Sequence, residues 1–266
     1  MKRCLKGRLL LICLAVLAGI VLAVNVGATE TDVAATVTYG VEGVDGWGSQ
    51  SATFKAPEGW LLSFDNMGFS SELKRFTSYE GNYTYYLLKS GEETPIEKSV
   101  GLKLDVGKPI ISNVAVSKVT DSAATVTVTA TDALSGVYRY EMNGVSNADG
   151  LFALSGLSPN TSYKYMVTVY DKAGNSNATE CTFTTEKTDI SNSVVTVGGT
   201  YTYNGGAQTP TANAVTVVLN GKTLGTDQYD FEAADNIDAG TATVTVTGKG
   251  AFSGTAKGSF TIGKKR

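Results

Sequence analysis

Two stretches of this chain alternate strictly between threonine and small apolar residues, and this pattern limits its fold more than any other feature. They read TVTVTA at 125–130 and TATVTVT at 241–247. A period of two places the apolar residues on one face of a strand and the threonines on the other, as in half-buried strands of antiparallel sheets. No segment after residue 28 shows a helical period of 3.6 residues. We therefore predict an all-β protein.

The first 28 residues have the order of charged, apolar and small residues that is typical of a secretory signal peptide. Four basic residues within the first eight positions precede an apolar run at 9–24, and Val26-Gly27-Ala28 follows. We expect cleavage after Ala28 and a secreted or cell-surface protein. The alternative is an uncleaved anchor, because residues 9–26 come close to the roughly 20 apolar residues that cross a bilayer. Contact with a membrane is expected only through this segment.

Charge and residue usage exclude several classes of function. Removal of residues 1–28 leaves 18 basic and 25 acidic residues, a net charge of −7. Nucleic-acid binding requires a basic face for the phosphates, so we expect no nucleic-acid partner. The chain has no histidine, which excludes histidine-based catalytic triads and histidine-containing zinc sites. We predict no enzyme activity, no catalytic residue, no metal site and no cofactor.

Cys181 is the single cysteine after residue 28, because Cys4 and Cys13 belong to the signal segment. No intramolecular disulfide can then form, and Cys181 is expected to be a small buried apolar side chain. An exported chain that is rich in small and hydroxyl residues and free of disulfides is typical of bacteria, so we expect a bacterial source.

The strand pattern after residue 28 divides into three runs of about 75 to 80 residues, a normal length for a sandwich of roughly seven strands. We predict domains at 29–107, 108–186 and 187–266. The junctions, DVGKP at 105–109 and TEKTD at 185–189, are short. We therefore expect three tandem antiparallel β-sandwiches with separate cores.

A corner between two sheets is predicted in the second run. Pro159 favours a turn, and Tyr163 begins an alternating run from which it can hydrogen-bond to the upstream backbone as a tyrosine corner. The stretch resembles the L-x-P-x-T-x-Y pattern of the fibronectin type III module, with Leu157, Pro159, Thr161 and Tyr163 in the matching places. The resemblance covers about residues 109–185. The usual tryptophan of an early strand is missing, which moves the resemblance toward bacterial immunoglobulin-like repeats.

The segment Asp171–Asn175, DKAGN, is predicted to be a hairpin loop, because Gly174 and Asn175 tolerate positive φ. The alternative is a calcium contact that also uses Asp132 of TDALSG, since hard cations take several oxygen ligands at once. Two carboxylates are too few for such a site, so we interpret the loop as structural.

The third run begins YTYNG at 201–205 and ends NIDAGTATVTVTG at 236–248. These stretches resemble the mostly-β repeats of large bacterial surface proteins, which begin Y-x-Y-x-G and end N-x-x-A-G-T-A-x-V-x-V-x-G. The matching residues are Tyr201, Tyr203, Asn236, Gly240, Thr241, Ala242, Val244, Val246 and Gly248. Such repeats occur in tandem, which implies either a short family member or a fragment of a longer protein.

The first run resembles another bacterial immunoglobulin-like module and contains both tryptophans of the chain, Trp47 and Trp60. Aromatic rings on an open sheet face or loop bind the apolar faces of sugars, while nearby carboxylates meet the hydroxyl groups. With Asp45 and Asp65 close in sequence, the two tryptophans are candidate sugar contacts. The alternative is that one tryptophan fills the sandwich core and the other flanks a glycine-rich loop.

The resemblances imply a non-enzymatic bacterial protein, secreted or at the cell surface, whose immunoglobulin-like modules serve as a stalk, spacer or adhesion element. Its expected partners are glycans or cell-surface proteins. The alternatives are a carbohydrate-binding protein that uses the aromatic residues of the first module, and an accessory segment of a larger surface enzyme. An internal Lys to Asn isopeptide crosslink would suit such a chain, but no motif points to its three residues.

Overall fold

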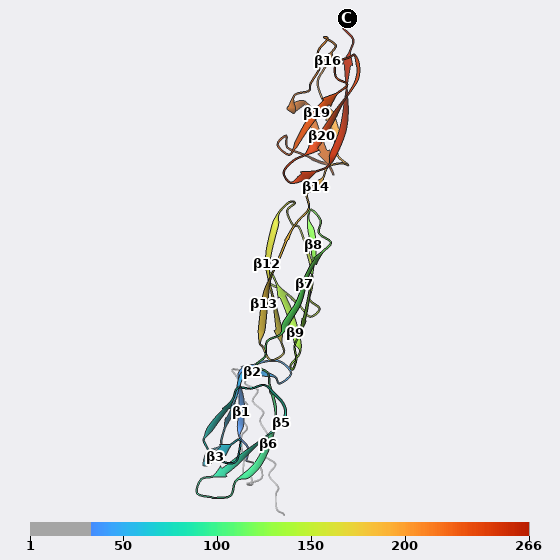
Figure 1. Cartoon of the computed structure of the whole chain (residues 1–266). Helices are drawn as coiled ribbons and strands as arrows, with labels where there is room; N and C mark the ends of the chain where they lie inside the picture. The colour runs from blue at the N-terminus through green and yellow to red at the C-terminus, as the bar shows by residue number, and fades with distance from the viewer. Residues whose placement is uncertain (1–32, 266) are drawn as a thin grey trace, which may run out of the picture. The chain divides into compact units, whose positions relative to one another are not determined.

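The computed structural model of the chain describes residues 33–265, and the predicted signal segment lies outside the described residues. The described chain is built of strands β1 to β22 and a short 3-10 turn at Ala212–Ala214 (Figure 1). The predicted all-β class of tandem β-sandwich domains is confirmed. Within residues 33–265, no helix is long and apolar enough to span a membrane.

The chain separates into two compact units. Of the described residues, the first unit contains 33–108 together with two short segments, Asp132–Gly136 and Asp171–Asn175. The second contains the remainder, and it holds two apolar cores while the first holds one. The domain that we predicted at 108–186 includes both of these short segments. The predicted domain boundaries stay a prediction.

The first unit is formed by a six-stranded sheet with the order β1-β2-β6-β5-β3, in which β4 pairs with β2. The strands are β1 (Thr36–Glu42), β2 (Gly48–Lys55), β3 (Trp60–Ser63), β4 (Glu72–Arg75), β5 (Tyr79–Lys89) and β6 (Ile96–Leu104). The sheet surrounds a core that includes Phe54, Leu62, Tyr85, Leu87 and Leu102, all buried. Burial of these large side chains is the main stabilising contribution to this unit.

Two sheets with the orders β10-β9-β12-β13 and β11-β8-β7 enclose the first core of the second unit. The strands are β7 (Ile110–Ser117), β8 (Ala123–Thr131), β9 (Val137–Met142), β10 (Val145–Asn147), β11 (Leu151–Ser155), β12 (Ser162–Asp171) and β13 (Ser176–Thr184). Val126 and Val128 of β8 are buried against Val167 and Val169 of β12, so the apolar face predicted from the alternation at 125–130 does point into the core.

The second core of this unit lies between the sheets β15-β17-β18 and β16-β22-β20-β19. The remaining strands are β14 (Thr188–Asp189), β15 (Val194–Val197), β16 (Tyr201–Thr202), β17 (Val215–Leu219), β18 (Lys222–Thr223), β19 (Tyr229–Ala234), β20 (Gly240–Gly248), β21 (Phe252–Ser253) and β22 (Thr255–Gly263). Ala242, Val244 and Val246 of β20 are fully buried. The second alternating stretch therefore also turns its apolar face inward.

The turn before β12 has the hydrogen bonds of a tyrosine corner. The backbone N–H of Ser158 donates to the Tyr163 hydroxyl at 2.7 Å. The Thr161 hydroxyl donates to the carbonyl of Pro159 at 2.9 Å, and the backbone N–H of Leu157 donates to Ser122 at 3.0 Å. The turn leaves these backbone groups without partners in a sheet, and these contacts give them hydrogen bonds. This polar stretch therefore has a structural role.

Candidate metal centre

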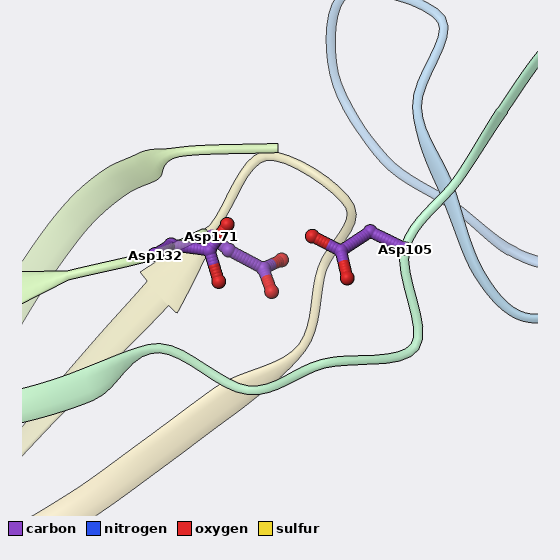
Figure 2. A group of neighbouring side chains, drawn as sticks. All are labelled: Asp105, Asp132 and Asp171. Carbon is purple, nitrogen blue, oxygen red and sulfur yellow. The ribbon is translucent and has the colours of Figure 1, made fainter. Parts of the chain in front are cut away.

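Three aspartates of the first unit come together although they are far apart in the sequence. Asp105 directly follows β6, Asp132 directly follows β8, and Asp171 is the last residue of β12. Each offers a carboxylate oxygen, and these oxygens lie within 4.8 Å of one another (Figure 2). Among residues 33–265, this aspartate cluster is a group of three side chains that could hold a metal ion.

The Asp105 carboxylate holds two segments of chain. Its Oδ1 accepts hydrogen bonds from the backbone N–H of Gly107 at 2.8 Å and from the Ser78 hydroxyl at 3.4 Å. Its Oδ2 accepts from the backbone N–H of Ser135 at 3.0 Å. With 2% exposure, Asp105 therefore fastens the segment Asp132–Gly136 to the end of β6.

The Asp132 carboxylate uses only one oxygen to shape its own turn. Oδ1 accepts from the backbone N–H groups of Leu134 and Gly136 at 3.2 and 2.8 Å, and from the Ser135 hydroxyl at 3.3 Å. Within the described chain, Oδ2 accepts no hydrogen bond. One oxygen of Asp132 is therefore available for another donor or for a cation.

Asp171 and Asn175 complete the cluster. The backbone N–H and the side-chain amide of Asn175 both donate to the Asp171 carboxylate at 2.8 Å. The same amide donates to the carbonyl of Asp105 at 2.9 Å. Asn175, which the sequence suggested only as a turn residue, thus links the hairpin loop to the end of β6.

The electrostatics of the cluster are unfavourable for three ionised carboxylates. Burial raises the pKa of Asp171, the hydrogen bonds from Asn175 oppose that rise, and the negative charges of Asp132 and Asp105 add to it. Asp171 is only 1% exposed, so water screens the repulsion poorly. A bound cation or a proton would relieve it.

The aspartate cluster offers oxygen ligands, which are the ligands that a hard cation prefers. Calcium prefers carboxylate and carbonyl oxygens, usually six to eight of them, and the three aspartates can supply carboxylate oxygens from three segments of one unit. The sequence raised Asp132 and the loop of Asp171 only as an alternative calcium contact, which was set aside because two carboxylates are too few, and it missed Asp105. Nothing in LDVGKP signals that the end of β6 returns to the other two loops.

The hairpin loop sits against the connection between β1 and β2. The backbone N–H of Val44 donates to the carbonyl of Lys172 at 2.8 Å, and the Lys172 ammonium lies 3.1 Å from the Asp45 carboxylate. A Cβ atom on Gly43 would lie 2.2 Å from that same carbonyl. The close approach therefore requires glycine at position 43, a requirement that the sequence alone did not reveal.

The residues predicted to contact sugar fall into two separate places. Asp45 is exposed and Trp47 is 5% exposed, and both lie in the loop before β2. Trp60 begins β3 and packs, half-buried, against the core. Asp65 follows β3, where hydrogen bonds from the Ser63 hydroxyl and the Met67 N–H lower its pKa. Sugar binding by the two indole rings stays a prediction.

Cys181 should react slowly with thiol reagents in the folded protein and fast after unfolding. Its side chain is 3% exposed on β13, and burial raises the pKa of the thiol, so little reactive thiolate is present. Labelling with a chromogenic disulfide reagent, with and without denaturant, measures the difference. Equal rates in both conditions would contradict the buried position.

The comparisons with known proteins return distant structural likenesses. No protein-family model matches the chain, and no curated protein matches it. Among solved structures, it is similar to the FN1-FN3 domains of chicken CNTN1, with 14% identity, a TM-score of 0.31, and coverage of 53% of this chain and 65% of that one. It is also similar to Sidekick-1 immunoglobulin domains 1-5, with 12% identity, a TM-score of 0.33, and coverage of 90% and 68%.

A third similar structure is that of PcdhgB3 EC1-4, with 13% identity, a TM-score of 0.31, and coverage of 88% of this chain and 77% of that one.

Proposed function

We propose that this chain is a non-enzymatic spacer or adhesion element of a bacterial protein that is secreted or displayed at the cell surface. One observation carries the proposal, which is that the polar groups that converge in the first unit connect its loops to its strands. The carboxylates of Asp105, Asp132 and Asp171 accept hydrogen bonds from the loops around them. They thereby connect strands to loops, and a spacer needs such connections in order to stay folded when its ends are pulled.

The burial of the same cluster argues against catalysis. A general acid or base must come within hydrogen-bond reach of its substrate, and a glycosidase needs two carboxylates across an open cleft. Asp105 and Asp171 are 2% and 1% exposed. Their oxygens are therefore closed to a substrate, although they remain suitable as ligands or as structural acceptors.

Single-molecule pulling tests the spacer function. Residues 29–266 are stretched from their two ends, and a spacer made of separately packed cores should unfold in discrete cooperative steps. Each step should release the chain length of one predicted domain, about 3.4 Å for each of its residues. Gradual extension without steps would contradict the proposal. So would turnover of a glycoside or peptide substrate by the purified chain.

A further inference from the structure

An open hollow of about 420 Å³ lies on the outer face of the first unit. It is bordered by strands β5 and β6 and by the loop before β2. The antiparallel register pairs Glu80 with Lys103 and Asn82 with Gly101. Residues directly opposite each other share a face of the sheet, and Leu102, the neighbour of both β6 residues, is buried in the core. These four residues therefore face outward together.

Gly101 creates the hollow because it is the outward position without a side chain. A Cβ atom at Gly101 would meet nothing within 4 Å, and its φ does not require glycine. The neighbouring outward pair, Thr84 and Ser99, carries side chains on both strands. The space above Gly101 is thus a gap in an otherwise covered surface, and the backbone there can be approached closely.

Lys103, which stands opposite Glu80, forms the charged side of the hollow. Its ammonium donates to the carbonyl of Asp45 at 3.2 Å and lies 5.7 Å above the ring of Trp47, within the range of a cation–π contact. Its backbone N–H donates to the Tyr39 hydroxyl at 3.0 Å. Trp47 thereby positions the Lys103 ammonium at the side of the hollow, even though its own ring is nearly buried.

Two polar side chains on the other side have no partner in the part of the chain that the structure describes. Within residues 33–265, the carboxylate of Glu80 and the side-chain amide of Asn82 form no hydrogen bond or ion pair. A carboxylate accepts hydrogen bonds, and an amide both donates and accepts. The hollow therefore presents a mixed set of donors and acceptors around an uncovered stretch of backbone.

We propose that this hollow binds one uncharged sugar residue of a glycan. Its volume falls within the range of roughly 300 to 1,000 Å³ that is usual for small-molecule sites. The charges around it balance, since Lys103 stands opposite Glu80 and Asp45 pairs with Lys172. A balanced hollow gives no net attraction to a charged ligand, whereas sugar hydroxyls match the mixed donors and acceptors. The proposal does not depend on the spacer function.

A glycan array of neutral mono- to trisaccharides, probed with residues 29–266, tests the assignment. The chain should bind a neutral glycan, and Gly101→Val should weaken that binding by roughly tenfold or more because the new side chain fills the hollow. Ser99→Val is the matched control, since it adds apolar bulk on the same strand and face but outside the hollow. It should bind as the unsubstituted chain does.

Glu80→Ala provides a second variant in case Gly101→Val perturbs the sheet. Glu80 is exposed and has no partner among the described residues, so its removal should leave the circular dichroism spectrum unchanged and weaken the binding. The assignment is wrong if no neutral glycan binds, if only anionic glycans bind, or if both hollow variants bind as tightly as the Ser99→Val control.

Discussion

Replacement of Phe54 by Ala should lower the free energy of unfolding of the first unit by about 3 to 5 kcal/mol, the usual cost of truncating a buried phenylalanine. Phe54 is fully buried. Its ring centroid lies 5.0 Å from that of Phe64, 5.5 Å from that of Tyr83 and 5.8 Å from that of Tyr85. The substitution therefore leaves a cavity and also removes favourable aromatic contacts.

Denaturant unfolding followed by tryptophan fluorescence measures this loss in the right part of the chain. Both tryptophans, Trp47 and Trp60, belong to the first unit, so the fluorescence change reports on that unit alone. Phe76→Ala is the control, because Phe76 is 63% exposed in the same unit and its loss should cost little. An effect of Phe54→Ala no larger than that of Phe76→Ala would show that the core is misassigned.

The fold was predictable because its information is local. Alternation along β8 and β20 fixes which face of each strand is apolar, and Val126 and Val244 are buried as that pattern requires. The turn before Tyr163 is equally local, since Ser158 and Tyr163 are five residues apart. Such features depend on near neighbours in the chain, so one sequence is enough to read them.

The aspartate cluster was only partly predictable because its contacts are not local. Asp105 reaches Ser135, 30 positions away, and Asn175 reaches the carbonyl of Asp105 across 70 positions. Strand order and register decide whether such segments meet, and alternation does not specify strand order. The close approach at Gly43 has the same origin, since it depends on where a loop from another part of the chain lies.

The residues around the hollow also come from segments that are far apart in the sequence, so the sequence did not show that they meet. Asp45 was singled out because it lies near a tryptophan, and it does border the hollow. Glu80, Asn82 and Lys103 were not recognised, because an isolated polar residue in a strand signals only an outward face. Their meeting depends on the register between β5 and β6. The sequence alone therefore could not show that these residues lie together, and sugar binding stays a prediction.

Calcium should stabilise the first unit, and Asp132→Asn should abolish most of that effect. A cation that binds only the folded state adds about 2.7 kcal/mol at a hundredfold excess over its dissociation constant. Asparagine at position 132 keeps the Oδ1 acceptor that shapes the turn, but it loses the negative charge and replaces the second oxygen with an NH2 group that cannot coordinate a cation. The measurement is the melting temperature, followed by tryptophan fluorescence, with calcium and with a chelator.

In the chelator, Asp132→Asn should not lower the melting temperature, whereas with calcium the variant should melt below the unsubstituted chain. This difference in direction makes the experiment decisive. Without a cation, Asp132→Asn removes one of three crowded negative charges, so the variant should melt no lower than the unsubstituted chain. Glu58→Gln is the control, because it removes one exposed negative charge from the same unit, away from the cluster. If calcium stabilises all three proteins equally, it binds elsewhere, and the cluster serves only to fasten its loops. If Asp132→Asn is destabilised in the chelator, repulsion does not govern the cluster, and the hydrogen bonds to Asp132 outweigh its charge.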